Sequence, residues 1–228
     1  MIPRWTTFPS DAALCKSVLD IIVETAAQAI AQRGRFDIVL AGGTTPRKIY
    51  QDLKTVQTDW ARWHIWYGDE RCLPPDNAER NSKMAYDTLL RFVAIPTRQI
   101  HPIPAELGAA IAANNYNRQL GMMGEFDLVL LGLGEDGHTA SLFPGDTWDN
   151  GEATIAVSNA PKPPSDRVSL TASRLSRSRQ VIFIVTGAGK QQAIGAWRRG
   201  TPLPASAITS KGPLDVFMDL AASGQKRP

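Results

Sequence analysis

The chain has 228 residues, of which 43% are hydrophobic and 21% are charged. A chain of this length and composition can bury a core without metals or disulfides, so we predict a globular protein and exclude disordered, fibrous and coiled-coil classes. The formal net charge is +3, and the Lys and Arg residues are scattered along the sequence. This balance is compatible with a small anionic ligand and argues against a nucleic-acid partner.

The cysteines and the N-terminal segment indicate the compartment. Cys15 and Cys72 are too few for a disulfide framework and have no metal-ligand spacing, so we expect no metal. The first residues lack the apolar core of a signal peptide, and no apolar run approaches the length of a membrane-spanning helix. We expect a soluble, cytoplasmic protein with no membrane partner, and a monomer is favoured although the sequence does not fix the oligomeric state.

A long helix comes first in the predicted order. Ser10 is a suitable N-cap, apolar residues follow at helical spacing from Leu14 to Ala29, and Gly34 interrupts the pattern. Four apolar segments then recur along the chain: FDIVLAGG from Phe36, WHIWYGDE from Trp63, FDLVLLGLG from Phe126 and VIFIVTGAG from Val181. They lack polar alternation, which is typical of parallel strands buried on both faces.

Helical stretches separate these strands. They lie at about residues 46–56, 79–90, 107–122 and 190–199. Two further short strands are predicted at 153–157 and 168–171, joined by a proline-rich surface loop. Strands alternating with helices predict an α/β fold with a doubly wound, mostly parallel sheet flanked by helices. We expect a single domain over residues 1–222 and a disordered tail, SGQKRP, at 223–228.

Each of the four strong strands runs directly into glycines and polar residues. In an open parallel sheet the carboxyl ends of the strands lie along one edge, and ligands bind at that edge. We therefore expect segments that are distant in the sequence to share one site.

The first strand is followed by a glycine turn. Gly42 and Gly43 remove side-chain bulk, and Thr44 and Thr45 supply hydroxyls at the start of a helix. Exposed backbone N–H groups at such a helix start can bind an anion. The alternative interpretation is an ordinary tight turn between a strand and a helix.

Charged residues follow the second and fourth strands. Arg71 offers a planar set of donors for a phosphate or carboxylate, and the neighbouring Asp69 can orient a side chain or a water molecule. Lys190 follows two loop glycines at a helix start, where a cation is unfavourable unless an anion joins it. Arg167, at the start of a later strand, is a further anion contact. For each of these groups the alternative is a solvated surface charge.

The most specific segment is GEDGHTASLFPG, directly after the third strand. Its glycines permit a tight loop that fixes the imidazole of His138, and Asp136 can orient the ring or tune its basicity. A purely structural histidine is the alternative. Ser141 lacks the GxSxG context of a nucleophile. His64 and His101 are expected to be structural.

Together, these segments resemble the 6-phosphogluconolactonase family. The matching segments occur in the family's order between residues 36 and 198: LAGGTTPRKIYQDL, YGDERCLPPDNAERNSKMAYDTLL, FDLVLLGLGEDGHTASLFPG, PPSDRVSLT and VTGAGKQQAI. The resemblance implies hydrolysis of 6-phospho-D-glucono-1,5-lactone to 6-phospho-D-gluconate in the oxidative pentose phosphate pathway. It implies a small-molecule substrate, no metal or organic cofactor, and the α/β fold of glucosamine-6-phosphate deaminases.

The resemblance also implies roles for the residues singled out above. His138, oriented by Asp136, is expected to activate a water molecule that attacks the lactone carbonyl. The phosphate is expected to be held by three cations, Arg71, Lys190 and Arg167. The segment Gly42, Gly43, Thr44 and Thr45 would line the pocket, and Asp69 would contact sugar hydroxyls or hold Arg71.

Two other functions are weighed against the lactonase. A glucosamine-6-phosphate deaminase has the same fold, but its loop typically reads DGHIAFNEPG and its acidic segment Asp-Glu-Tyr, whereas this chain has DGHTASLFPG and Asp-Glu-Arg. A non-enzymatic sugar-phosphate sensor would retain the pocket, and the intact Asp136 and His138 argue against it. The sequence therefore favours the lactonase.

Overall fold

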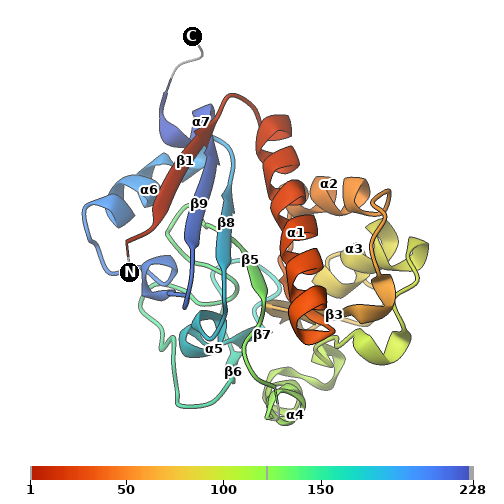
Figure 1. Cartoon of the computed structure of the whole chain (residues 1–228). Coiled ribbons are helices and arrows are strands. Elements are labelled where there is room, and N and C mark those ends of the chain that lie inside the picture. The colour runs from red at the N-terminus through yellow and green to blue at the C-terminus, as the bar shows by residue number, and fades with distance from the viewer. Residues whose placement is uncertain (1, 122, 226–228) are drawn as a thin grey trace.

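The core of the molecule is a six-stranded parallel sheet (Figure 1). A computed structural model describes residues 2–121 and 123–225. The strands run in the order β1-β9-β8-β5-β2-β3, and every neighbouring pair is parallel. Their bounds are β1 Arg4–Phe8, β2 Phe36–Leu40, β3 Trp63–Tyr67, β5 Leu128–Gly132, β8 Val181–Val185 and β9 Leu214–Asp219. The predicted α/β fold with a mostly parallel sheet is confirmed.

Helices cover both sides of this sheet, as a doubly wound fold requires. In Figure 1, α1 and α2 lie on one side and α6 on the other. The helices are α1 Asp11–Arg33, α2 Thr44–Leu53, α3 Asn81–Thr88, α4 Ala109–Leu120, α5 Ala172–Ser176, α6 Gln191–Arg198 and α7 Leu220–Ser223. The predicted stretches differ from α2, α3, α4 and α6 only at their ends, and Met122, the predicted end of α4, lies outside the described residues.

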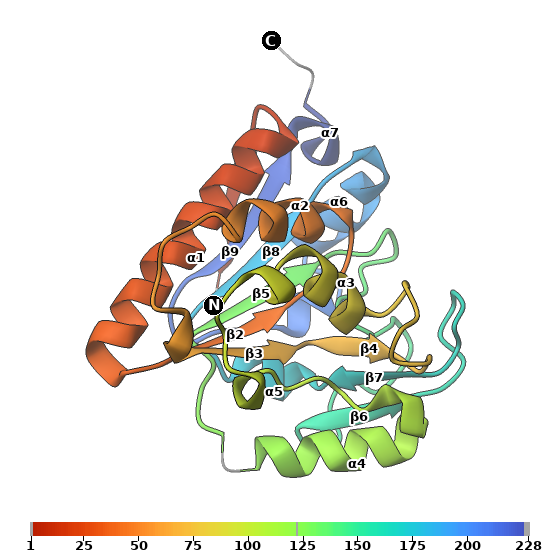
Figure 2. The same cartoon turned by 90° about the vertical axis from the view of Figure 1, so that its right-hand side faces the viewer.

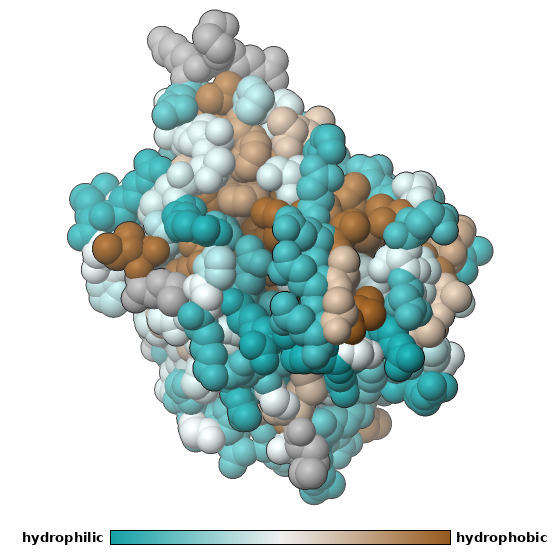
Figure 3. All heavy atoms as spheres, viewed as in Figure 1, coloured by the Kyte–Doolittle hydropathy of each residue, from teal (hydrophilic) through white to brown (hydrophobic). Residues whose placement is uncertain are grey.

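Helix α1 shows how the sequence determines these boundaries. The side chain of Ser10 accepts a hydrogen bond from Ala13 N, and Gly34 adopts φ 73° and donates its N–H to Ile30 O. Both are the capping interactions expected of these residue types. Leu14, Val18, Ile22 and Ala26, spaced four residues apart, are buried against the sheet. Figure 3 shows hydrophilic residues along the outer side of this helix, with apolar residues between them in small groups.

A second, smaller sheet lies beside the first (Figure 2). It is antiparallel, in the order β4-β7-β6, with bounds β4 Asp69–Arg71, β7 Arg167–Leu170 and β6 Thr154–Val157. Helix α4 packs against β6 and β7. The strands β6 and β7 were expected from the sequence, whereas β1, β4 and β9 were not. The consequence for the site is that β4 brings Asp69 and Arg71 next to β7.

Two buried tyrosines fix the ends of the strands that lead into the predicted site. The Tyr50 hydroxyl, on α2, donates to Ala41 O at 2.9 Å and accepts from Ala41 N at 3.0 Å, directly after β2. The Tyr116 hydroxyl, on α4, accepts from Tyr67 N at 3.0 Å, at the end of β3. Both rings are fully buried, so these hydrogen bonds replace the water that the strand ends would otherwise bind.

The C-terminal end of the described chain is ordered. Ser223 is the last residue of α7, Gly224 adopts a left-handed conformation, and Gln225 N donates to Leu220 O at 3.1 Å. The predicted domain end after residue 222 therefore falls inside a helix. Residues 226–228, the rest of the predicted disordered tail, lie outside the described residues.

The two histidines expected to be structural, His64 on β3 and His101 beyond it in the chain, pack together. The His101 ring stacks on Trp66 with centroids 3.9 Å apart, and His101 Nε2 lies 3.4 Å from His64 Nδ1. Burial, and next the charge of His64, lowers the pKa of His101 to about 4 from its ordinary 6.5. Burial also lowers the pKa of His64. The folded protein therefore favours the neutral form of both rings.

This pKa depression predicts a loss of stability at mildly acidic pH. Between pH 6.5 and 4 the unfolded chain binds a proton at His101 and the folded chain does not, so the free energy of unfolding falls as the pH falls. His101→Phe keeps the stacking on Trp66 and removes the titration. Urea unfolding at pH 7 and pH 5 should show that the variant loses less stability than the wild type, by about 1 kcal/mol after allowance for partial exposure. Equal losses would contradict the assignment.

Candidate active site

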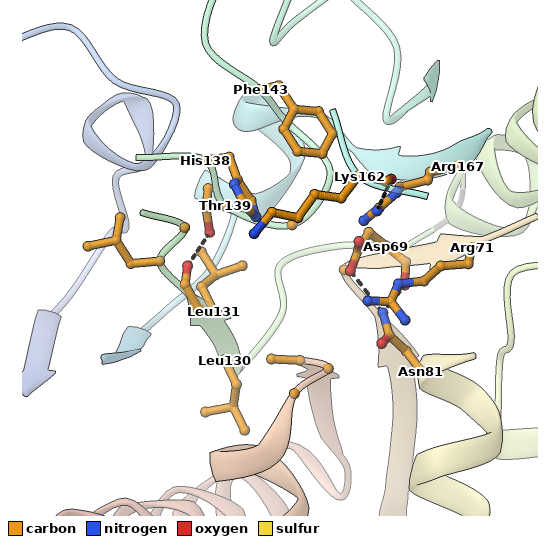
Figure 4. A pocket seen from close by; sticks show the side chains of 18 of the residues that line it. Asp69, Arg71, Asn81, Leu130, Leu131, His138, Thr139, Phe143, Lys162 and Arg167 are labelled. Atoms are coloured by element: carbon orange, nitrogen blue, oxygen red, sulfur yellow. Dashed lines mark hydrogen bonds between the residues drawn. The ribbon is translucent and has the colours of Figure 1, made fainter. Parts of the chain in front are cut away.

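A cavity of about 380 Å³ opens at the carboxyl ends of the parallel strands (Figure 4). Gly42 after β2, Asp69 after β3, His138 after β5 and Lys190 after β8 all line it. The four segments that the sequence assigned to one site therefore do meet.

The imidazole of His138 is held by its own loop. Its Nδ1 lies 2.6 Å from Asp136 Oδ1, and its backbone N–H donates to the same oxygen at 3.1 Å. Gly134 N closes the loop by donating to His138 O at 2.7 Å. Because the Asp136 carboxylate accepts from Nδ1, the proton of the neutral ring is on Nδ1 and the lone pair is on Nε2.

The loop also favours the ionised form of Asp136. Burial acts to raise the pKa of this carboxyl group, but the backbone N–H and the ring of His138 outweigh it and hold the pKa below its ordinary value. A charged Asp136 can stabilise an imidazolium that forms beside it. The pair is thus arranged as a base with a fixed orientation.

Glycine is required at the start of this loop. A Cβ on Gly134 would lie 2.0 Å from His138 Nδ1 and 2.5 Å from Asp136 Oδ1. Gly42, which also lines the cavity, is equally restricted, because its Cβ would lie 2.0 Å from Asn81 Oδ1. At both positions the backbone itself therefore forms part of the cavity wall.

Asp69 is buried and held by two side chains that the sequence analysis did not select as binding residues. Ser141 Oγ donates to Asp69 Oδ2 at 2.6 Å, and Asn81 Nδ2 donates to Asp69 Oδ1 at 3.0 Å. Ser141 is only 1% exposed, so its hydroxyl supports Asp69. No sequence pattern indicated these contacts, because the partners come from three distant segments.

The adjacent acid, Glu70, fixes the start of α3. It is fully buried, and its carboxylate accepts from Arg71 N at 2.9 Å and from Asn81 N and Ser82 N at 2.8 Å each. Arg80 Nε lies 3.5 Å away. A carboxylate at a helix N-terminus is favourable because several N–H groups there lack partners within the helix. Glu70 therefore holds Asn81 next to Asp69.

Arg71 and Arg167 face each other across β4 and β7, where they are register partners. Arg71 Nη1 donates to Glu79 O, and its Nε is buried without a hydrogen-bond partner among the described residues. Two like charges directly opposite each other on a sheet are unfavourable unless an anion joins them. The pair is therefore suited to bind a phosphate.

Arg167 also holds the loop between β6 and β7. It is 7% exposed, so the alternative of a solvated surface charge does not apply to it. Its Nη2 donates to Lys162 O at 2.8 Å and its Nε to Pro164 O at 3.1 Å. Burial lowers its pKa from the ordinary value, and the charge of Asp69 opposes that shift.

Phe143 packs against both ends of the site, with its ring centroid 4.9 Å from that of His138 and 5.7 Å from the Arg167 guanidinium.

Thr44 and Thr45 face away from this cavity. Both line a separate hollow beside the start of α1, and Thr45 Oγ1 is hydrogen-bonded to Thr186 Oγ1 at 2.8 Å. Gly43, at φ 108°, lies between the threonines and Gly42 and turns the chain. The structure thus brings Gly42 and Gly43 to the cavity with Asp69, Arg71, His138, Arg167 and Lys190, and leaves the two threonines outside it.

Lys162, which was not predicted from the sequence, lines the cavity from the proline-rich loop. The only indication in the sequence was its position close to Arg167.

Over the described ranges, no group of three or more His, Cys, Asp or Glu residues is arranged to hold a metal ion. Within the same ranges, none of the helices combines the length and apolar character needed to cross a bilayer.

This fold and site define a class, the sugar-phosphate isomerases and lactonases. The family model of glucosamine-6-phosphate isomerases and 6-phosphogluconolactonases matches residues 9–217. The chain is 35% identical to the 6-phosphogluconolactonase of Synechocystis sp., with 100% of both chains covered. It is 38% identical to that of Mycobacterium leprae, over 79% of this chain and 80% of the relative. The chain therefore belongs to the 6-phosphogluconolactonase family.

Solved structures agree with this assignment. The 6-phosphogluconolactonase from Trypanosoma brucei matches with a TM-score of 0.88 at 27% identity, over 98% of both chains. A monomeric glucosamine-6-phosphate deaminase matches with a TM-score of 0.80 at 17% identity, a likeness of fold alone. A chloroplastic 6-phosphogluconolactonase from Arabidopsis thaliana is 35% identical, and the chain spans 66% of that relative's length.

The hydrogen bonds around Glu70 predict that a conservative substitution at this position destabilises the fold. Glu70→Gln places an amide group against backbone N–H donors and removes the charge beside Arg80, so we expect the free energy of unfolding to fall by roughly 2 kcal/mol or more. Urea unfolding measures it. Glu79→Gln, at an exposed position of the loop between β4 and α3, is the matched control and should change stability by less than about 0.5 kcal/mol. Similar small effects in both variants would contradict the role of Glu70.

Proposed function

We propose that this protein hydrolyses 6-phospho-D-glucono-1,5-lactone to 6-phospho-D-gluconate in the oxidative pentose phosphate pathway. The observation that carries the proposal is the His138–Asp136 pair, 2.6 Å apart, on a cavity that also contains the opposed Arg71 and Arg167. A phosphorylated lactone needs a water-activating base at one end and an anion site at the other. The relatives at 35% and 38% identity are 6-phosphogluconolactonases, in support of the same substrate.

His138 serves as the base in this mechanism. Its Nε2 takes a proton from a water molecule as the water oxygen bonds to the lactone carbonyl carbon, and the carbonyl electron pair moves to oxygen. When the carbonyl re-forms, the bond to the ring oxygen breaks and His138 returns the proton to that oxygen. Asp136 stabilises the imidazolium in between. General-base catalysis contributes about 10²–10⁴ in rate, a moderate demand for an activated ester that needs no cofactor.

The phosphate is placed with the cations. Arg71 and Lys190 hold it, with help from Arg167, and its charge relieves the repulsion between the two arginines. Asp69 faces the same cavity and can accept hydrogen bonds from sugar hydroxyls. Binding the phosphate, which does not react, positions the carbonyl against the activated water. A monomer in the cytoplasm, without a nucleic-acid or membrane partner, remains our expectation for its setting.

His138→Asn is the direct test of this function. The variant keeps a polar side chain but has no basic nitrogen, so kcat should fall by about 10²–10⁴ while KM changes less than about threefold. Proton release from freshly prepared lactone measures the rate, with a control without enzyme because the lactone also hydrolyses spontaneously. No acceleration by the wild type would reject the lactonase, and ammonia release from glucosamine 6-phosphate would then test the deaminase alternative.

Gly134→Ala tests the orientation of the base without altering it chemically. Its Cβ would overlap His138 Nδ1, so the ring must move and kcat should fall by about 10² or more. Gly124→Ala is the matched control, because a Cβ there meets no atom within 4 Å. If Gly134→Ala and Gly124→Ala have equal kcat, the geometry of the loop is not what makes His138 a base.

A further inference from the structure

Lys162 reaches the cavity from the loop between β6 and β7. Its side chain lines the cavity and extends from the side of Arg167 toward His138 (Figure 4). Among the residues that the structure describes, no carboxylate pairs with its ammonium group and no side-chain hydrogen bond holds it. An unpaired cation is therefore directed at the end of the cavity where water is activated.

The backbone of this lysine is fixed although its side chain is exposed. Arg167 donates to the carbonyls of Lys162 and Pro164, at 2.8 and 3.1 Å. Within the same loop, Ala160 N donates to Ser165 O at 2.9 Å. The buried guanidinium of Arg167 thus fixes the backbone from which the Lys162 side chain extends.

Three backbone N–H groups of the His138 loop form hydrogen bonds within the loop itself. Gly134 N donates to His138 O, Gly137 N to Gly134 O, and His138 N to Asp136 Oδ1. These N–H groups are not directed at a substrate oxygen. The charge that develops on the carbonyl oxygen during hydrolysis needs a donor placed in advance, and such donors contribute strongly to catalysis.

We propose that Lys162 is a catalytic residue that stabilises this oxyanion. The inference rests on the hydrolytic function proposed above. As the water oxygen bonds to the carbonyl carbon, an N–H of the Lys162 ammonium donates a hydrogen bond to the oxygen that gains the electron pair. Lysine keeps its proton throughout. When the carbonyl re-forms, the hydrogen bond weakens, the ring C–O bond breaks, and the proton on His138 passes to the ring oxygen.

Lys162→Met tests the charge while keeping the length of the side chain. We expect kcat to fall by about 10²–10³, as when one oxyanion donor is removed, with KM changed less than about threefold. Lys162→Arg keeps the charge and should restore kcat to within about tenfold of the wild type. Lys16→Met, at an exposed position of α1, is the matched control and should keep the wild-type kcat.

The outcomes separate this inference from the proposed function. The wild type is assayed first against spontaneous hydrolysis, and no acceleration would overturn both. If the wild type is active, a Lys162→Met kcat within about threefold of it overturns only the role of Lys162. A loss confined to KM does the same, because it would make Lys162 a substrate-binding cation such as Lys190. The circular dichroism spectrum and urea midpoint of the variant should match the wild type, since the side chain is exposed.

Arg167→Lys provides an independent test of the loop. The change removes the donors to the loop carbonyls, so kcat should fall by about tenfold or more in the wild-type background. In the Lys162→Met background the same change should lower kcat by clearly less than it does in the wild-type background, because the positioning of Lys162 no longer contributes and only the contact of Arg167 with the phosphate is lost. Additive losses in kcat would contradict the link between Arg167 and Lys162.

Discussion

At Gly68 the chain leaves the parallel sheet and enters the antiparallel one, and the site depends on this junction. Gly68 N donates to Leu40 O at the end of β2, at 3.3 Å, and Gly68 O accepts from Leu170 N of β7, at 2.8 Å. One residue is therefore hydrogen-bonded to both sheets. Because Asp69, Glu70 and Arg71 follow at once, the junction fixes how these charged groups lie relative to the His138 loop.

The two acids after the junction, Asp69 and Glu70, point in different directions and have different roles. Glu70 points into the protein and satisfies N–H groups at the start of α3, while Asp69 faces the cavity and is held by Asn81 and Ser141. His138, the proposed base, is organised differently, because its partner Asp136 is only two residues away. The end of the cavity with His138 is thus built from a local loop, and the end with the arginines is built from segments that the fold brings together.

This difference explains which features could be predicted from the sequence and which could not. The His138–Asp136 pair is local, so its spacing was visible in the sequence, and strands buried on both faces left runs that are continuously apolar, as in β8, or apolar apart from Asp37, as in β2. Strand β4 has three residues and pairs with β7 about a hundred residues later, so no local pattern indicates it. The guanidinium of Arg167 donates hydrogen bonds to loop carbonyls, and Lys162 lies in the same loop. Hydrophobic periodicity does not predict the path of a loop, so neither arrangement could be predicted from the sequence. Thr44 and Thr45 follow Gly43, whose positive φ turns the chain at this point, and the sequence does not specify the direction of that turn.

The backbone walls of the cavity also determine how substrate choice can change. Gly42 and Gly134 have no room for a side chain, so neither position can be varied to reshape the pocket. The loop between β6 and β7 carries exposed residues and is held by the guanidinium of Arg167 and by a hydrogen bond from Cys72 N to Asp166 O. Selectivity for other phosphorylated lactones would therefore be engineered, or would evolve, through the length and composition of this loop, with the two glycine walls left unchanged.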